Sequence, residues 1–229
     1  MIGIVWDFDG VLVFTPHEKA WKMATEMYGG YLTHDFFVRY VSGKPRYEGA
    51  RNILERLGIY EKVGAYTVEE KEKVLREFAE LKNRIVNEMF DRGEYEVNWE
   101  AIEFLLEAKR KGVKNALASA SKNATKLARK IKVGSRTLLD LFDINVSGKA
   151  PSKKEVFKLA IKELQKKFSV KKVLVIEDAP AGIEAAKELG AITLGYERDW
   201  KLNADITFSS FSDLSLKDIL GVIEDEVRS

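Results

Sequence analysis

Two aspartates end the first apolar segment of the chain. Ile2–Trp6 is followed by Asp7 and Asp9, with Gly10 directly after them. Residues i and i+2 of an extended segment face the same side, so both carboxylates can point at one site. Two adjacent negative charges are unfavourable unless a cation such as Mg²⁺ lies between them, and Mg²⁺ prefers oxygen ligands. Taken alone, the segment is equally explained by a strand and an Asp-Gly turn.

A second acidic pair follows another apolar segment. Val173–Ile176 leads directly into Glu177 and Asp178. In open parallel α/β sheets, ligands bind outside the carboxyl ends of the strands, so two acidic strand ends at that edge would make a cation site. Asp178 alone would also suit a cap for the helix expected after Pro180.

Two further segments carry groups that could bind a phosphate. Ala118–Asn123 places hydroxyls before a helix, and a hydroxyl followed by backbone N–H groups at a helix N-terminus can bind an anion. Ser119 or Ser121 could equally be a simple N-cap. Ser147–Glu155 offers Lys149 and Lys153, either of which could balance the charge of two aspartates and a phosphate, although most lysines in such a lysine-rich chain are surface groups.

Short apolar segments alternate with helical patterns, which predicts an α/β protein with a Rossmann-like parallel sheet. Within most of these segments apolar and polar residues do not alternate, as expected for strands covered on both faces. The predicted strands are Ile2–Trp6, Val113–Ser119, Ile144–Val146, Val173–Glu177, Ala191–Gly195 and Asp205–Phe208. The predicted helices between them span about 98–111, 152–168 and 180–189.

The stretch from about residue 14 to 92 is different, because its patterns are helical throughout. Apolar residues spaced by three and four form one stripe on a long helix from Val74 to Met89. Shorter helices fit Pro16–Tyr28 and Pro45–Leu57, each with proline in its first turn. We therefore predict an α/β core of residues 1–13 and 93–229 with an inserted all-helical domain of residues 14–92. The mixed-charge tail Gly221–Ser229 is expected to be a solvated helix end.

Composition limits the classes of function. The formal net charge of +2 is too balanced to indicate a nucleic-acid or membrane-surface partner, and the absence of Cys excludes disulfides, thiolate metal sites and cysteine nucleophiles. No apolar run approaches the roughly 20 residues that span a bilayer, and the N-terminus lacks the features of a signal peptide. We therefore expect a cytoplasmic protein. Absent Cys, only four Met and many Lys and Glu favour a heat-adapted source.

The four segments occur in the order of the four motifs of the haloacid dehalogenase-like hydrolase superfamily, which the chain resembles over nearly its whole length. The segment Glu177–Ala186 (EDAPAGIEAA) is similar throughout to the fourth motif of the phosphoglycolate phosphatase and β-phosphoglucomutase branch. The inserted helical domain resembles the cap of that branch. The lysine segment departs from the pattern, because Lys149 is followed by Ala150-Pro151 and Lys153 begins the helix, so we favour Lys153 and keep Lys149 as an alternative.

This resemblance implies a role for each motif. Asp7 would be the nucleophile that forms an aspartyl-phosphate, and Asp9 would be the general acid and then the base. Mg²⁺ would be held by the carboxylates of Asp7 and Asp178 and the backbone carbonyl of Asp9, with Glu177 acting directly or through water. Ser119 and the N–H of Ala120 would hold phosphoryl oxygens.

The same resemblance implies a substrate pocket like that of β-phosphoglucomutase and a cap that excludes water on closing. Taken singly, matching residues such as His17 and Lys82 are also explained by ordinary surface polarity, whereas the run Ser121–Asn123 is less easily explained in that way. Val11–Thr15 lacks the Asp-Thr pair of the mutase hinge. The corresponding residues here are His17, Arg46, Lys82, Ser121, Lys122 and Asn123.

Three functions follow from these residues. We expect a Mg²⁺-dependent phosphatase of a small phosphorylated metabolite, of the sugar phosphate or phosphoglycolate type. The alternative is a mutase that moves phosphate within a sugar. A receiver-like signalling module is a third, but its phosphorylated Asp follows a middle strand and it carries no long helical insert. The sequence leaves open whether the protein is a monomer or a small homo-oligomer.

Overall fold

The structure, a computed structural model, describes residues 1–198 and 200–221. The chain divides into two compact units, one formed by Met1–Phe14 with Val97–Ser229 and the other by Thr15–Glu96. We call the first the core unit and the second the inserted unit. The expected boundaries lay after residues 13 and 92. Except for Gly221, the tail expected to be a helix end lies outside the described residues.

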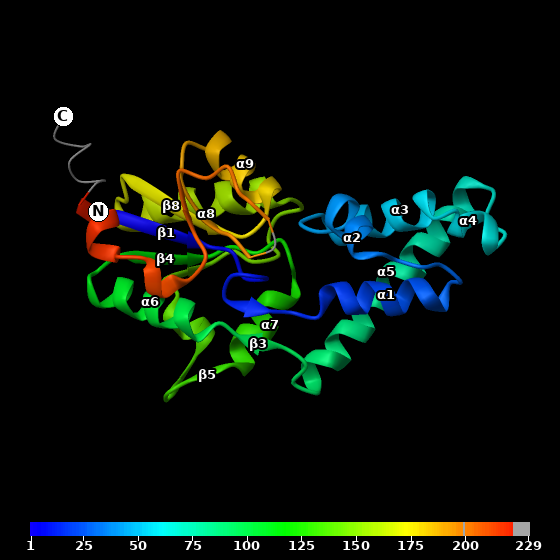
Figure 1. Cartoon of the computed structure of the whole chain (residues 1–229), viewed down its shortest axis with the longest axis horizontal. Coiled ribbons are helices and arrows are strands. Elements are labelled where there is room, and N and C mark those ends of the chain that lie inside the picture. The colour runs from blue at the N-terminus through cyan, green and yellow to red at the C-terminus, as the bar shows by residue number, and fades with distance from the viewer. Residues whose placement is uncertain (199, 222–229) are drawn as a thin grey trace. The chain divides into compact units, whose positions relative to one another are not determined.

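The core unit contains a parallel β-sheet. Among the described residues its strands are ordered β10-β9-β8-β1-β4-β7, and every neighbouring pair is parallel (Figure 1). The strands are β1 (Ile2–Trp6), β4 (Lys114–Leu117), β7 (Ile144–Asn145), β8 (Lys172–Glu177), β9 (Ile192–Tyr196) and β10 (Ile206–Phe208). This α/β fold was predicted, and each predicted strand coincides with one of these within about two residues.

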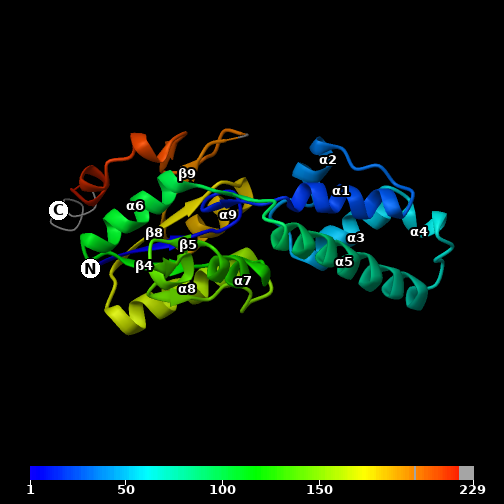
Figure 2. The ribbon, with the colours of Figure 1, turned by 90° about the horizontal axis from the view of Figure 1, so that it is seen from below.

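Helices cover both faces of the sheet, because its strands are apolar on both sides. One face packs against α8 (Lys153–Phe168) and α9 (Pro180–Glu188) through aliphatic side chains such as Val5 and Val175. The other face is aromatic. Trp6, next to Val5 and therefore pointing the opposite way, contacts Phe104 of α6 (Trp99–Arg110), with ring centroids 6.1 Å apart. Figure 2 shows α6 and α8 on opposite sides of the sheet.

In the inserted unit two helices pack against the long helix α5 (Val68–Asp91), and the two shortest helices pack against one of those two. Thr67 begins α5 with a capping box in which Glu70 completes the pair of hydrogen bonds. The predicted apolar stripe is largely buried there, with Phe78, Ile85 and Met89 in the interior. The shorter helices are α1 (His17–Met27), α2 (His34–Tyr40), α3 (Arg46–Arg56) and α4 (Ile59–Lys62).

Short elements account for most differences from the sequence-based prediction. β2 (Val13–Phe14) and β3 (Glu96–Val97) pair where the chain leaves and re-enters the core unit, so Phe14 is in a strand and not in a helical region. Helices α2 and α4 and a hairpin of β5 (Lys132–Val133) and β6 (Arg136–Thr137) were also not predicted. Elements of two to seven residues are too short to show a period in the sequence.

Candidate active site

Three carboxylates converge at the carboxyl ends of β1 and β8. These strands are neighbours in the sheet, with Trp6 aligned to Ile176, so the residues that follow them emerge side by side. Asp7, Glu177 and Asp178 each place one carboxylate oxygen within 4.8 Å of the others. Asp7 and Glu177 are buried and Asp178 is half-buried. The structure therefore brings together three of the four expected metal-ligating residues through their side chains.

Lys153, the first residue of α8, joins this cluster. Its Nζ lies 2.6 Å from Oδ1 of Asp7 and 3.1 Å from Oε2 of Glu177, and its side chain is only 14% exposed. Ser152 caps α8 by accepting a hydrogen bond from the N–H of Glu155, which fixes where the helix begins. Lys149, the alternative lysine, is exposed. The favoured lysine is thus placed against the expected nucleophile.

Burial and the charges of neighbouring groups shift the pKa values of Asp7, Asp178 and Lys153. Burial raises the pKa of Asp7 to about 8, and the Glu177 carboxylate raises this pKa too, while Lys153 opposes the shift. Burial also raises the pKa of Asp178, with Glu177 and Asp7 adding to the effect. Burial alone would lower the pKa of Lys153, but the carboxylates of Asp7 and Glu177 outweigh it and raise that pKa. Full ionisation of the three carboxylates would therefore give more negative charge than Lys153 alone balances.

The donor set fits a divalent cation such as Mg²⁺. Oδ1 of Asp7 and Oε2 of Glu177 are buried and, among the described residues, accept no hydrogen bond of good geometry, although both have Lys153 at ion-pair distance. Buried carboxylate oxygens without hydrogen bonds are unfavourable unless a cation is near. Mg²⁺ takes oxygen ligands and needs only one or two carboxylates from the protein. Asp7 and Asp178 would hold it, with Glu177 beside them.

Glycine is required where the two acidic turns meet. Gly10 has φ of +87°, and a Cβ built on it would lie 1.9 Å from Oδ2 of Asp178. The turn of Gly10 is closed by its N–H, which donates to the carbonyl of Val13 at 2.8 Å. The Asp-Gly turn considered as an alternative explanation of this segment is thus present, and it also brings the segment against Asp178. Asp178 does not cap α9, whose N-cap residue is Ala179 and has no side-chain hydrogen bond.

The Ser119 hydroxyl lies beside the second aspartate. Its Oγ is 3.4 Å from Oδ2 of Asp9, to which it donates, and it accepts the N–H of Ser121 at 3.0 Å. Ser121 in turn accepts the N–H of Asn123, the first residue of α7 (Asn123–Lys130). Both serines therefore bind backbone N–H groups two residues ahead. Ala120, Lys122 and Asn123 follow in the same segment at the carboxyl end of β4, and Lys122 is exposed.

The predicted residues of the inserted unit fall into two groups. Nζ of Lys82 donates to Nδ1 of His17 at 2.9 Å and lies 4.8 Å from the ring centre of Trp21. Lys82 is only 6% exposed, which is unusual for a lysine. Arg46, at the start of α3, pairs with Glu80 of α5, with Nη1 3.2 Å from Oε1. The structure brings His17 and Lys82 together and shows Arg46 in a separate ion pair.

Several residues around the site were not predicted from the sequence. Asn98 is buried, and its Nδ2 donates to the carbonyl of Val11 at 2.9 Å, which holds the segment after Asp9. Ser147 accepts the N–H of Ser119 at 3.1 Å. These are single polar residues without a repeating pattern. The one available signal was the position of Asn98 at a helix start.

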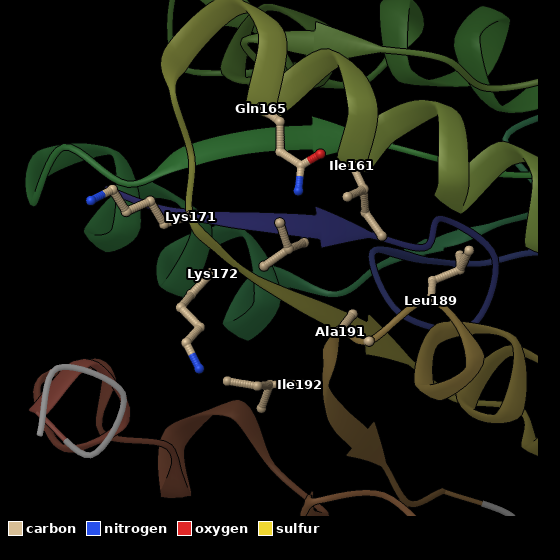
Figure 3. A pocket seen from close by; sticks show the side chains of 9 residues that line it. Ile161, Gln165, Lys171, Lys172, Leu189, Ala191 and Ile192 are labelled. Carbon is tan, nitrogen blue, oxygen red and sulfur yellow. The ribbon is translucent and has the colours of Figure 1, made fainter. Parts of the chain in front are cut away.

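A small cavity of about 90 Å³ lies elsewhere in the core unit (Figure 3). Its walls include Ile161 and Gln165 of α8, Lys172 at the start of β8 and Ile192 at the start of β9. The carboxylates follow the carboxyl end of β8, whereas this cavity lies at the amino ends of β8 and β9. It contains none of the predicted site residues.

Comparisons with known proteins identify the family of this chain. A family model for haloacid dehalogenase-like hydrolases matches residues 2–190, and the chain therefore belongs to that family. A crystal structure described as an archaeal β-phosphoglucomutase from Pyrococcus sp. strain ST 04 is 70% identical, with a TM-score of 0.87, and the alignment covers 98% of this chain and 100% of that one.

Two curated relatives are more distant and differ in their names. A phosphorylated carbohydrates phosphatase of Thermotoga maritima is 30% identical, covering 83% of this chain and 82% of the relative. A β-phosphoglucomutase of Bacillus subtilis is also 30% identical, covering 95% and 93%. Among the described residues, no helix has the length and apolar character needed to cross a membrane.

Proposed function

We propose that this protein transfers a phosphoryl group from a small phosphorylated sugar to Asp7 and then to water, as a Mg²⁺-dependent phosphatase. The observation that carries the proposal is the convergence of Asp7 with Glu177, Asp178 and Lys153 at the carboxyl ends of β1 and β8. A buried carboxylate beside a lysine ammonium and a candidate cation site is suited to attack phosphorus.

The proposed phosphoryl transfer has two steps. In the first, a carboxylate oxygen of Asp7 forms a bond to phosphorus and the bond from phosphorus to the sugar oxygen breaks, while Asp9 gives its proton to that leaving oxygen. In the second, Asp9 takes a proton from water, the water oxygen bonds to phosphorus, and the bond to Asp7 breaks to release phosphate.

Charge at phosphorus would be balanced by groups around Asp7. Bound Mg²⁺ would neutralise part of the negative charge on the phosphoryl oxygens. The ammonium of Lys153 already lies 2.6 Å from Asp7 and would offset further charge. The Ser119 hydroxyl and the N–H of Ala120 would donate to phosphoryl oxygens, because preorganised donors stabilise a charge-spread transition state.

The inserted unit would select the substrate. Its helices carry His17, Arg46 and Lys82, and cationic or hydrogen-bonding groups of this kind recognise a sugar hydroxyl or a second phosphate. We propose that this unit acts as a cap domain. The names of the relatives, a phosphatase of phosphorylated carbohydrates and β-phosphoglucomutases, support a phosphorylated sugar as the substrate.

A specific observation favours a second candidate, a β-phosphoglucomutase. The 70% identical structure carries that description. Both reactions share the transfer to Asp7 and differ in the second acceptor, which is a sugar hydroxyl in a mutase. The contact between Lys82 and His17 supplies a cation and an imidazole that could serve such a sugar.

The first experiment measures phosphate release from p-nitrophenyl phosphate with Mg²⁺ and with EDTA, for the wild type, Asp7→Asn and the control Asp35→Asn. Asp35 is exposed in the inserted unit. We expect turnover that requires Mg²⁺ and is lost only in Asp7→Asn. Turnover that survives Asp7→Asn would contradict the mechanism.

The second experiment separates the two candidates. β-Glucose 1-phosphate is supplied with and without glucose 1,6-bisphosphate, and both glucose 6-phosphate and free phosphate are measured. Rapid phosphate release without the bisphosphate supports the phosphatase. Isomerisation that depends on the bisphosphate, with slow hydrolysis, supports the mutase.

A further inference from the structure

Two side chains that follow β9 contact the backbone of the two acidic turns. Nη1 of Arg198 donates to the carbonyl of Gly10 at 3.3 Å, and its guanidinium carbon lies 4.0 Å from the ring centre of Phe14. Nε1 of Trp200 donates to the carbonyl of Asp178 at 2.8 Å. One short part of the chain therefore holds both turns, although those turns are far apart in the sequence.

The contacts come from a loop that is tied down at its base. The N–H of Glu197 donates to the carbonyl of Phe208 at 2.8 Å, and Oε1 of Glu197 accepts the N–H of Leu202 at 2.9 Å. Trp200 is half-buried. An anchored loop can fix the positions of the groups that it touches, whereas a free one cannot.

The two turns lie directly against one another. A Cβ on Gly10 would lie 1.9 Å from Oδ2 of Asp178, so the backbone of one turn is in contact with the carboxylate of the other. Mg²⁺ demands nearly ideal octahedral geometry with oxygen ligands at about 2.0–2.1 Å. A shift of either turn would therefore change the separation of ligand atoms on which cation binding depends.

We propose that Arg198 and Trp200 are positioning residues that hold the turns of Asp9 and Asp178 at the spacing required for the cation. Arg198 holds the first turn at the carbonyl of Gly10, and Asn98 holds the next residue, Val11, at its carbonyl. Trp200 holds the second turn at the carbonyl of Asp178 itself. The consequence for the cation rests on the proposed function, whereas the restraint on the turns does not.

The test compares Trp200→Phe with the matched control Trp99→Phe. Phenylalanine keeps an aromatic ring and removes the N–H donor. Trp99 is 53% exposed on α6 and serves as the control for loss of an indole. Mn²⁺ binding is measured by calorimetry, and amide hydrogen exchange over residues 177–183 is measured in the metal-free protein.

We expect Trp200→Phe to weaken Mn²⁺ binding roughly 10-fold, as for other residues that orient metal ligands, and to speed exchange over 177–183 with little change in Tm. Trp99→Phe should change neither quantity. Arg198→Lys, which retains the charge and loses the planar guanidinium, provides a second variant and should weaken Mn²⁺ binding in the same direction.

Each outcome decides one of the two proposals. If Trp200→Phe and Arg198→Lys bind Mn²⁺ like the wild type and exchange over 177–183 is unchanged, the positioning role is wrong. If the wild type itself binds no Mn²⁺, the metal-dependent function fails, and the exchange data still decide whether Trp200 restrains the turn of Asp178.

Discussion

Gly182 leaves space that the carboxylate of Glu177 fills. A Cβ built on Gly182, in α9, would lie 2.1 Å from Oε2 of Glu177 and 2.2 Å from its Cδ. The other oxygen of Glu177, Oε1, accepts the N–H groups of Asp178 and Ala179, each at 3.1 Å. The carboxylate is thus held between its own turn and α9.

Gly182→Ala should therefore displace Glu177. We expect a loss of stability of about 1–3 kcal/mol, as for overpacked interiors, and Mg²⁺ activation that requires roughly 10-fold more cation. Thermal unfolding and a Mg²⁺ titration of activity measure the two effects. Gly221→Ala is the control, because among the described residues no atom beyond its neighbours in the chain and its own helix backbone lies within 4 Å of a Cβ there. Unchanged Mg²⁺ activation would mean that Glu177 has no part in holding the cation.

Lys153→Met should lower phosphate release roughly 100-fold, since it removes the ammonium that lies between Asp7 and Glu177. Lys149→Met, which alters an exposed lysine of the same segment, is the matched control and should retain activity. Steady-state assays at saturating Mg²⁺ check both variants. If Lys149→Met loses activity and Lys153→Met does not, the two lysines have been assigned in the wrong order.

The metal-free protein should lose stability as the pH rises from about 4 to 8. Burial raises the pKa of Asp7 to about 8, above the ordinary value of 3.8. The folded state therefore holds a proton that the unfolded chain has released in this window, so unfolding becomes easier as pH increases. Thermal unfolding in EDTA measures the trend.

Two comparisons check the source of this pH dependence. Asp7→Asn should flatten the trend, because the amide does not titrate. Mg²⁺ should raise Tm more at about pH 8 than at about pH 5, since the cation no longer competes with the proton. An equal Mg²⁺ effect at both pH values would show that no ligand proton is displaced.

Lys82→Met should affect sugar phosphates more than simple esters. The buried ammonium of Lys82 donates to His17, and methionine keeps most of the apolar stem while removing the charge. We expect kcat/KM for a sugar phosphate to fall at least roughly 10-fold, with p-nitrophenyl phosphate hydrolysis nearly unchanged. Lys73→Met, on the exposed surface of α5, is the control. An equal loss on both substrates would place Lys82 outside substrate selection.

Much of the core could be predicted because its signals are local. The strand Ile2–Trp6 has the same bounds in sequence and structure, since a compact apolar run leads into an acidic turn. The acidic pairs after β1 and β8 could be placed together because parallel strands bring their carboxyl ends to one edge. The lysine was harder, and Lys153 was favoured over Lys149 by its place at the start of a helix.

The contacts that support the site could not be predicted, because they join residues far apart in the sequence and no periodic pattern marks those residues. Trp200 and Asp178 are joined by an indole hydrogen bond, and Asn98 and Val11 by an amide. Nothing in the residue types near either partner indicates such a pairing. The two unpredicted helices of the inserted unit, α2 and α4, are too short to show an apolar stripe. The heat-adapted source and the cytoplasmic location remain predictions from composition.

The strand that precedes Asp7, β1, pairs with β8, which lies about 170 residues later in the chain, with Ile2 opposite Lys172. Closing so long a loop is slow, whereas the helices of the inserted unit contact one another over shorter separations in the sequence and can form earlier. We therefore expect the nascent chain to hold its acidic residues apart until β8 has been synthesised and has paired with β1. The ability to capture a cation would then be one of the last properties that the folding protein gains.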